Sequence, residues 1–131
     1  MIVTKKQAEG LKELGYDKIC EGFFTDDLDQ PQRDELIGDA NFNNIIEPDW
    51  FSAPYIYDAI CFMDECGVQV WSTPYWVGDS IKWVLGIRTK DHTRIEDKKH
   101  FDTREQSDSA GLDFAIDYLI KQKKKKKCHK K

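Results

Sequence analysis

The stretch VQVWSTPYWVGDSIKWVLGIRT, residues 68–89, decides how the middle of this chain folds. Its second half alternates between apolar residues and polar or small ones, and the apolar set is Ile81, Trp83, Leu85 and Ile87. This period of two is typical of a strand with one buried face. Gly78-Asp79 suits a two-residue hairpin turn, and counting back from it places Val70 opposite Ile87. Because both strands are then apolar on the same face, we predict an antiparallel hairpin.

The outer face of this hairpin is the candidate binding face. Its residues are Trp71, Tyr75, Lys82 and Arg88. Aromatic rings beside basic side chains are what base stacking combined with phosphate contact requires, and they are also common at protein–protein hot spots. The alternative is that a helix covers this face and that Trp71 packs over Gly86. On the opposite face we expect Trp83 to be a core residue, more buried than Trp71.

Helical patterns lie on both sides of the hairpin. A capping box of Thr4 and Gln7 predicts a helix over about residues 5–14. Ser52 as N-cap, with Pro54 in the first turn, predicts a second helix. A third helix is indicated by an apolar stripe made of Leu112, Ala115, Ile116, Leu119 and Ile120.

These elements predict an α+β fold in a single domain over residues 1–120. It would hold three helices with an antiparallel β-hairpin, or a three-stranded meander if residues 94–101 add a strand. Residues 15–51 show no clear periodicity. Within them, the pattern favours only a short strand at 19–24.

The net charge of −4 hides an acidic body and a basic tail. The last eleven residues, KQKKKKKCHKK, hold 8 of the 20 basic residues and no acid, which leaves 12 Lys and Arg against all 24 Asp and Glu in residues 1–120. Because like charges in a block repel and stay solvated, we expect residues 121–131 to be a flexible tail. Weak, non-specific contact with nucleic acid is the other role open to it. The lysines that would make this contact are Lys123, Lys124, Lys125, Lys126 and Lys127.

Catalytic and metal-binding signatures are missing from the sequence. There is no glycine-rich phosphate loop, no metalloprotease or serine-hydrolase motif, and no zinc spacing among the four cysteines. We therefore predict no catalytic residue, no metal site and no cofactor, and an enzyme is the least favoured class. No apolar stretch has the length of a signal peptide core or a membrane span, so we expect a cytoplasmic protein without a membrane partner.

One part of the chain has a family resemblance. The segment from SAPYIYDAICFMDECGVQVW through Trp83 to KKHFDTREQSDSAGLDFAIDYLI resembles small uncharacterised proteins encoded by phages and prophages of gut Bacteroidetes. The shared features are the S-A-P helix start, the tryptophan-bearing strand pair and the F-D-T-x-E start of a terminal helix, over about residues 50–120. The resemblance implies a phage accessory protein in the host cytosol and carries over no catalytic residue.

Three functions remain open on this basis. The first is a protein-interaction module whose partner is a host or phage protein. The second is a nucleic-acid-binding protein that uses the aromatic and basic sheet face together with the lysine tail. The third is an acidic mimic of nucleic acid that inhibits a host protein, which the excess of carboxylates in residues 1–120 would permit.

Deleting residues 123–131 should change the free energy of unfolding by less than about 0.5 kcal/mol, because the segment has no apolar stripe to bury. Urea unfolding of the full-length and truncated chains, followed by tryptophan fluorescence, measures the difference. A clearly lower midpoint for the truncated chain would mean that the lysine segment packs on the body.

Overall fold

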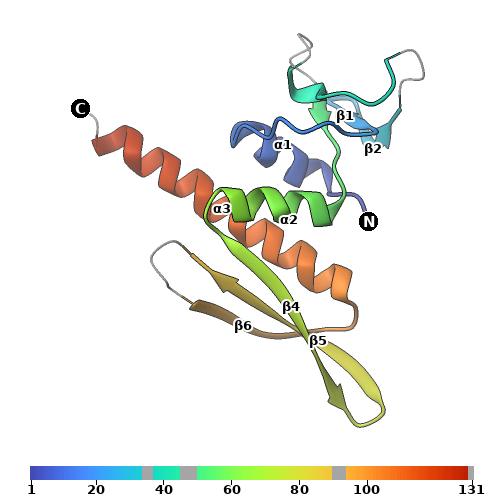
Figure 1. The fold of residues 1–131 in the computed structure, drawn as a ribbon, viewed down its shortest axis with the longest axis vertical. Helices are drawn as coiled ribbons and strands as arrows, with labels where there is room; N and C mark the ends of the chain where they lie inside the picture. The colour runs from blue at the N-terminus through green and yellow to red at the C-terminus, as the bar shows by residue number, and fades with distance from the viewer. Residues whose placement is uncertain (34–36, 45–49, 90–93, 130–131) are drawn as a thin grey trace. The chain divides into compact units, whose positions relative to one another are not determined.

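The computed structural model describes residues 1–33, 37–44, 50–89 and 94–129, with 94–99 and 127–129 described by their backbone alone (Figure 1). The described part holds three α-helices and two three-stranded antiparallel sheets, so the predicted α+β class is confirmed. The chain divides into two compact units, Met1–Tyr55 and Ile56–Lys131. This division does not test whether residues 1–120 form a single domain, which stays a prediction.

The first unit begins with α1, Lys5–Glu13, and its start is the predicted capping box. The Gln7 backbone N–H donates to Thr4 Oγ1 at 3.1 Å, and the Thr4 N–H donates to Gln7 Oε1 at 2.8 Å. These bonds satisfy backbone donors that the first helical turn cannot pair by itself. Leu11 is buried on the inner side of the helix, and Gly15 follows its end with φ +86°.

A three-stranded sheet completes the first unit, in a region where the sequence predicted almost nothing. The order is β2-β1-β3, with β1 at Phe23–Thr25, β2 at Leu28–Gln32 and β3 at Trp50–Ser52. Phe23 stacks on Trp50 with ring centroids 4.1 Å apart, and Phe42 completes the cluster with its ring centroid 4.8 Å from Phe23 and 6.3 Å from Trp50. The strand favoured at 19–24 overlaps β1 only at its last two residues.

The second unit opens with α2, Ile56–Glu65, which begins four residues after the predicted N-cap. Ser52 is the last residue of β3 instead: its N–H donates to Asn43 Oδ1 at 2.8 Å, and its hydroxyl accepts from the Asn43 N–H at 3.1 Å. The expectation that Ser52 caps this helix is therefore wrong, because its hydrogen bonds are already made to Asn43. The buried side of α2 consists of Ile56, Ala59, Phe62 and Met63.

The predicted hairpin is present in the predicted register. Strands β4 (Gln69–Val77) and β5 (Ser80–Arg88) pair so that Val70 faces Ile87. Gly78 in the turn has φ +60°, a conformation that glycine adopts without strain. Strand β6, Arg94–Phe101, adds the third strand of the meander, and the sheet order is β4-β5-β6.

Pro74 sits in the middle of β4 without breaking this ladder. In a two-residue hairpin the residues beside the turn exchange backbone hydrogen bonds, and every second residue from there does the same. Counting from Val77, the backbone of Pro74 faces away from β5. β4 is an edge strand of the described sheet, so the missing N–H removes no ladder bond and leaves this edge unsuited to pairing with another strand.

Helix α3, Arg104–His129, lies across one face of the β4–β6 sheet (Figure 1). Thr103 starts it by accepting a hydrogen bond from the Gln106 N–H at 3.1 Å. The closest approach is at Gly111, where an added Cβ would overlap Val70 and would lie 2.6 Å from Leu85 Cδ1. The inner face of the sheet is thus closed by a helix whose backbone sits directly on it.

The lysine-rich end is helical as far as His129, and the flexible tail expected over residues 121–131 stays a prediction. In the structure α3 continues without interruption to His129. The whole helix has 26 residues and is roughly 39 Å long. Its last nine residues, 121–129, hold most of the lysine segment and form about two and a half turns.

Replacing Gly111 by alanine tests this close approach. Alanine favours a helix over glycine by about 1 kcal/mol, but an extra methyl group against Val70 and Leu85 costs about 1–3 kcal/mol, so we expect a net loss of stability. Urea unfolding measures the sign, with Asp117→Ala on the exposed side of the same helix as the control. A more stable Gly111→Ala variant would contradict the packing described here.

Candidate functional site

The inner face of the hairpin is covered over only part of its length. Val70, Leu85 and Ile87 are buried under α3. Near the turn, Trp76 lies directly opposite Ile81, and their side chains are 69% and 44% exposed. Val77 beside them is 51% exposed. We call these three residues, Trp76, Val77 and Ile81, the hairpin tip.

The position where α3 begins explains this exposure. The guanidinium of Arg104, the first residue of α3, lies 5.9 Å from the ring centroid of Trp83. From there the helix runs past Leu85 and Val70, which Gly111 contacts about two turns later. The hairpin therefore extends beyond the start of the helix. Trp83, predicted to be core, is only half-buried because it lies at that boundary.

The outer face carries the four predicted binding residues on adjacent strands. Tyr75 pairs with Lys82, Trp71 with Gly86, and Arg88 with Gln69 at the other end. Trp71 is half-buried because its ring occupies the space that a side chain on Gly86 would fill. This part of the alternative interpretation is confirmed. Its other part is wrong within this unit, since α3 packs against Val70 and Leu85 on the inner face.

The charge of the outer face is lower than the sequence indicates. Lys82 forms an ion pair with Asp102, which follows the end of β6. Tyr75 packs against His100 with ring centroids 5.0 Å apart. Arg88 is exposed at the far end of the strand pair. Among the residues whose side chains the structure describes, this face combines aromatic and polar groups with one balanced cation and one exposed cation.

The tail lysines lie on α3 rather than beside the outer face. Lys123, Lys124, Lys125 and Lys126 are exposed along the helix, and the side chain of Lys127 lies outside the described residues. Because α3 packs on the inner face, the structure does not bring these lysines together with the aromatic residues of the outer face. The two predicted sites are separate.

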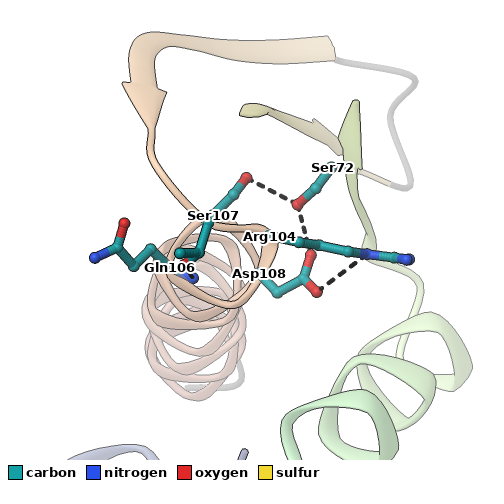
Figure 2. A network of polar contacts seen from close by, with 6 residues as sticks. Ser72, Arg104, Gln106, Ser107 and Asp108 are labelled. Carbon is teal, nitrogen blue, oxygen red and sulfur yellow. Dashed lines mark hydrogen bonds and ion pairs between the residues drawn. The ribbon is translucent and has the colours of Figure 1, made fainter. Parts of the chain in front are cut away.

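A polar network that the sequence reasoning missed joins β4 to the first turn of α3 (Figure 2). The Ser72 hydroxyl lies 2.5 Å from Asp108 Oδ1 and 2.8 Å from the buried Ser107 Oγ. A hydroxyl has one proton, so Ser72 donates to the carboxylate and accepts from Ser107. Arg104 adds an ion pair with Asp108 at 3.7 Å. The sequence signal that could have indicated this network is Ser72 itself, because the alternation of β4 places this serine on the buried face.

A second polar group lies in the first unit, beside a small hollow lined in part by Gly22 and Ala53. Glu21 Oε2 accepts from Arg33 at 2.5 Å and from the Tyr55 hydroxyl at 2.9 Å. The hydrogen bond to Glu21 and the charge of that carboxylate raise the pKa of Tyr55. The charge of the Glu21 carboxylate is therefore balanced by its neighbours. The three residues link separate segments of the first unit.

Cys66 and the possible metal ligands are the remaining groups of chemical interest among the described residues. Burial, with a smaller contribution from Glu65, raises the pKa of the Cys66 thiol, which disfavours the reactive thiolate. In the part of the chain that the structure describes, no three His, Cys, Asp or Glu side chains gather as metal ligands would. None of the helices described is both long and apolar enough to cross a membrane.

Comparison with known proteins adds no relative to these observations. No family model matches the chain, and no curated protein or solved structure was found to be similar to it. The resemblance to phage and prophage proteins stays a prediction.

Replacing Ser72 by alanine should destabilise the second unit by about 1–3 kcal/mol, because the buried Ser107 hydroxyl would lose its acceptor. Thermal or urea unfolding measures the loss. Thr73→Ala is the matched control, since Thr73 is the exposed neighbour on the same strand. Equal effects of the two substitutions would mean that the network contributes nothing beyond strand propensity.

Proposed function

We propose that this chain is a protein-interaction module, of the phage accessory type that its sequence resembles, and that its β4–β5 hairpin is the recognition element. The observation that carries the proposal is the exposure of Trp76 opposite Ile81. Both residues continue an alternation that buries Val70, Leu85 and Ile87 further along the same face. A large apolar group left in water on such a face is typical of a surface that another protein covers.

The chemistry of the hairpin tip favours a protein over the other two classes of partner. Its three side chains are apolar, and Asp79 lies in the turn between them. Phosphates would meet no cation there, and Lys82 on the neighbouring face is already paired with Asp102. The nucleic-acid alternative therefore loses support at the sheet, where it needed an aromatic and basic surface.

Recognition would use side chains rather than strand addition. Pro74 offers no N–H at the free edge of β4, which disfavours pairing with a strand from the partner. Trp76 instead supplies the aromatic anchor that dominates many interfaces, and Tyr75 and Arg88 on the outer face belong to the same hot-spot class. A partner with an apolar pocket for the indole fits this arrangement, in the host cytosol as the resemblance implies.

The double substitution Trp76→Ser, Ile81→Thr should abolish partner binding while leaving the fold intact, because both side chains are largely exposed. The measurement is a pull-down with the full-length protein from nuclease-treated lysate of the host cell, with the recovered proteins quantified by mass spectrometry. Circular dichroism checks that the variant is folded.

Tyr57→Ser is the matched control, since Tyr57 is an exposed aromatic residue on α2 in the same unit, 73% accessible to solvent. The control should recover the same proteins as the unmodified chain. Unchanged recovery by the tip variant would contradict the proposal, and so would a partner that disappears when nuclease is added.

A further inference from the structure

The inner face beyond the start of α3 holds an aromatic patch that is wider than the hairpin tip. Paired residues on neighbouring strands point to the same face, so Pro74, Trp83 and Phe101 form one row across β4, β5 and β6. Trp76 and Ile81 form the next row toward the turn. Pro74, Trp76 and Ile81 are exposed, and Trp83 and Phe101 are half-buried. We call these five residues the aromatic patch.

The aromatic patch has the size of a site for a short segment of a partner chain. Neighbouring strands lie about 4.8 Å apart, and every second residue of a strand lies about 7 Å further along, so the patch measures about 10 Å by 7 Å. A standard interface between folded proteins uses about 20–30 residues on each side. A second folded copy of this chain would therefore find too little surface here for a stable dimer.

The edge of the sheet restricts the conformation of such a segment. A partner strand would have to pair with the free edge of β4, where Pro74 offers no N–H. A segment in the polyproline II conformation needs no strand edge, because it binds through side-chain rings and leaves its backbone solvated. Surfaces lined by aromatic rings are where proline-rich segments of this kind bind. The composition of the patch therefore favours polyproline II over a β-strand.

The spacing of the aromatic positions fits the period of this helix. Polyproline II has about three residues per turn and rises about 3.1 Å per residue, so residues i and i+3 lie on one side about 9 Å apart. Trp76 is a diagonal neighbour of Trp83, about 7–8 Å away, and lies about 12 Å from Phe101. One prolyl ring can thus pack on Trp76 while the ring three residues away packs on Trp83 and Phe101.

Polar groups beside the patch suit the backbone of the segment. A polyproline II helix makes no internal hydrogen bonds, so its carbonyl groups accept from outside. Arg104 is exposed beside Trp83, and its guanidinium has several N–H donors besides the Nε that faces Asp108. The indole N–H of the largely exposed Trp76 is a further donor. Asp79 lies in the turn, at the end of the patch opposite Arg104, and favours a basic residue on that side of the segment.

From these features we propose that the aromatic patch binds a proline-rich segment of the partner protein, in the polyproline II conformation and with prolines three residues apart. This inference rests on the proposed function, because Trp76 and Ile81 of the hairpin tip belong to the patch. Prolyl rings against the Trp76 indole supply the apolar contact that recognition by the tip requires.

The test is an NMR titration of the full-length protein with a peptide of three Ala-Leu-Pro repeats after an N-terminal arginine. The chain has four tryptophans, and each indole N–H gives its own signal. The signals of Trp76 and Trp83 should shift, and those of Trp50 and Trp71 should stay in place. The largest shift at Trp71 would put the segment on the outer face and overturn the inference.

A matched peptide tests the conformation of the segment. Replacing every proline by alanine keeps the length and charge but removes the rings and favours an α-helix. We expect this peptide to bind at least tenfold more weakly than the proline peptide. Equal or tighter binding of the alanine peptide would overturn the inference, and so would a failure of the proline peptide to bind at about 1 mM.

Substitutions test the location. Trp76→Ser should weaken binding of the proline peptide about thirtyfold, the usual loss for a hot-spot tryptophan. Trp76→Phe keeps an aromatic ring and should retain most of the affinity. Tyr57→Ser, which removes an exposed aromatic residue from α2, should leave the affinity unchanged. Equal losses for Trp76→Ser and Tyr57→Ser would contradict a site on the patch.

The lysate experiment separates this inference from the proposed function. If Trp76→Ser, Ile81→Thr removes lysate partners but the proline peptide does not bind the unmodified protein, only the inference fails. If the double substitution changes neither recovery nor peptide binding, both fail. Sedimentation of the full-length protein covers the remaining occupant: a dimer that the double substitution dissociates would place a second copy on the patch and overturn the inference.

Discussion

The contact of Gly111 with Val70 and Leu85 is the constraint on which the second unit depends. Because an additional methyl group at residue 111 would overlap these two side chains, the helix backbone lies directly on the inner face of the sheet. The network of Ser72, Ser107 and Asp108 joins the same helix to β4 a turn earlier. These two contacts place the start of α3 at one point along the hairpin, and with it the boundary between covered and exposed residues.

Three surfaces of different chemistry follow from this placement. The hairpin extends past the start of α3, so Trp76 and Ile81 remain in water and form an apolar tip. The outer face, opposite the helix, keeps Trp71 and Tyr75 half-buried among their own neighbours. At its other end α3 continues into the lysine-rich segment. The proposed recognition of a protein partner belongs to the first of these surfaces.

Local pairing of charges changes the outer face of the sheet. The ion pair between Lys82 and Asp102 balances a cation that the sequence alone would assign to a nucleic-acid face. The lysines that follow Asp117 in the sequence lie on α3, which packs on the inner face, and not beside Tyr75 and Lys82.

The sequence by itself determined the hairpin, its register and the capping box of α1, because each depends on residues that are close in the chain. Alternation around Gly78-Asp79 specifies which residues share a face, but it does not specify how far a helix covers that face, so the exposure of Trp76 and the half-burial of Trp83 came only from the tertiary structure. The sheet of the first unit was missed for the same reason. Its strands β1 and β3 are three residues long, too short to show a period, and they are held by distant contacts such as Phe23 on Trp50. Ser52 failed as a predicted cap because Asn43, nine residues earlier, takes its hydrogen bonds, and only the folded chain brings the two together.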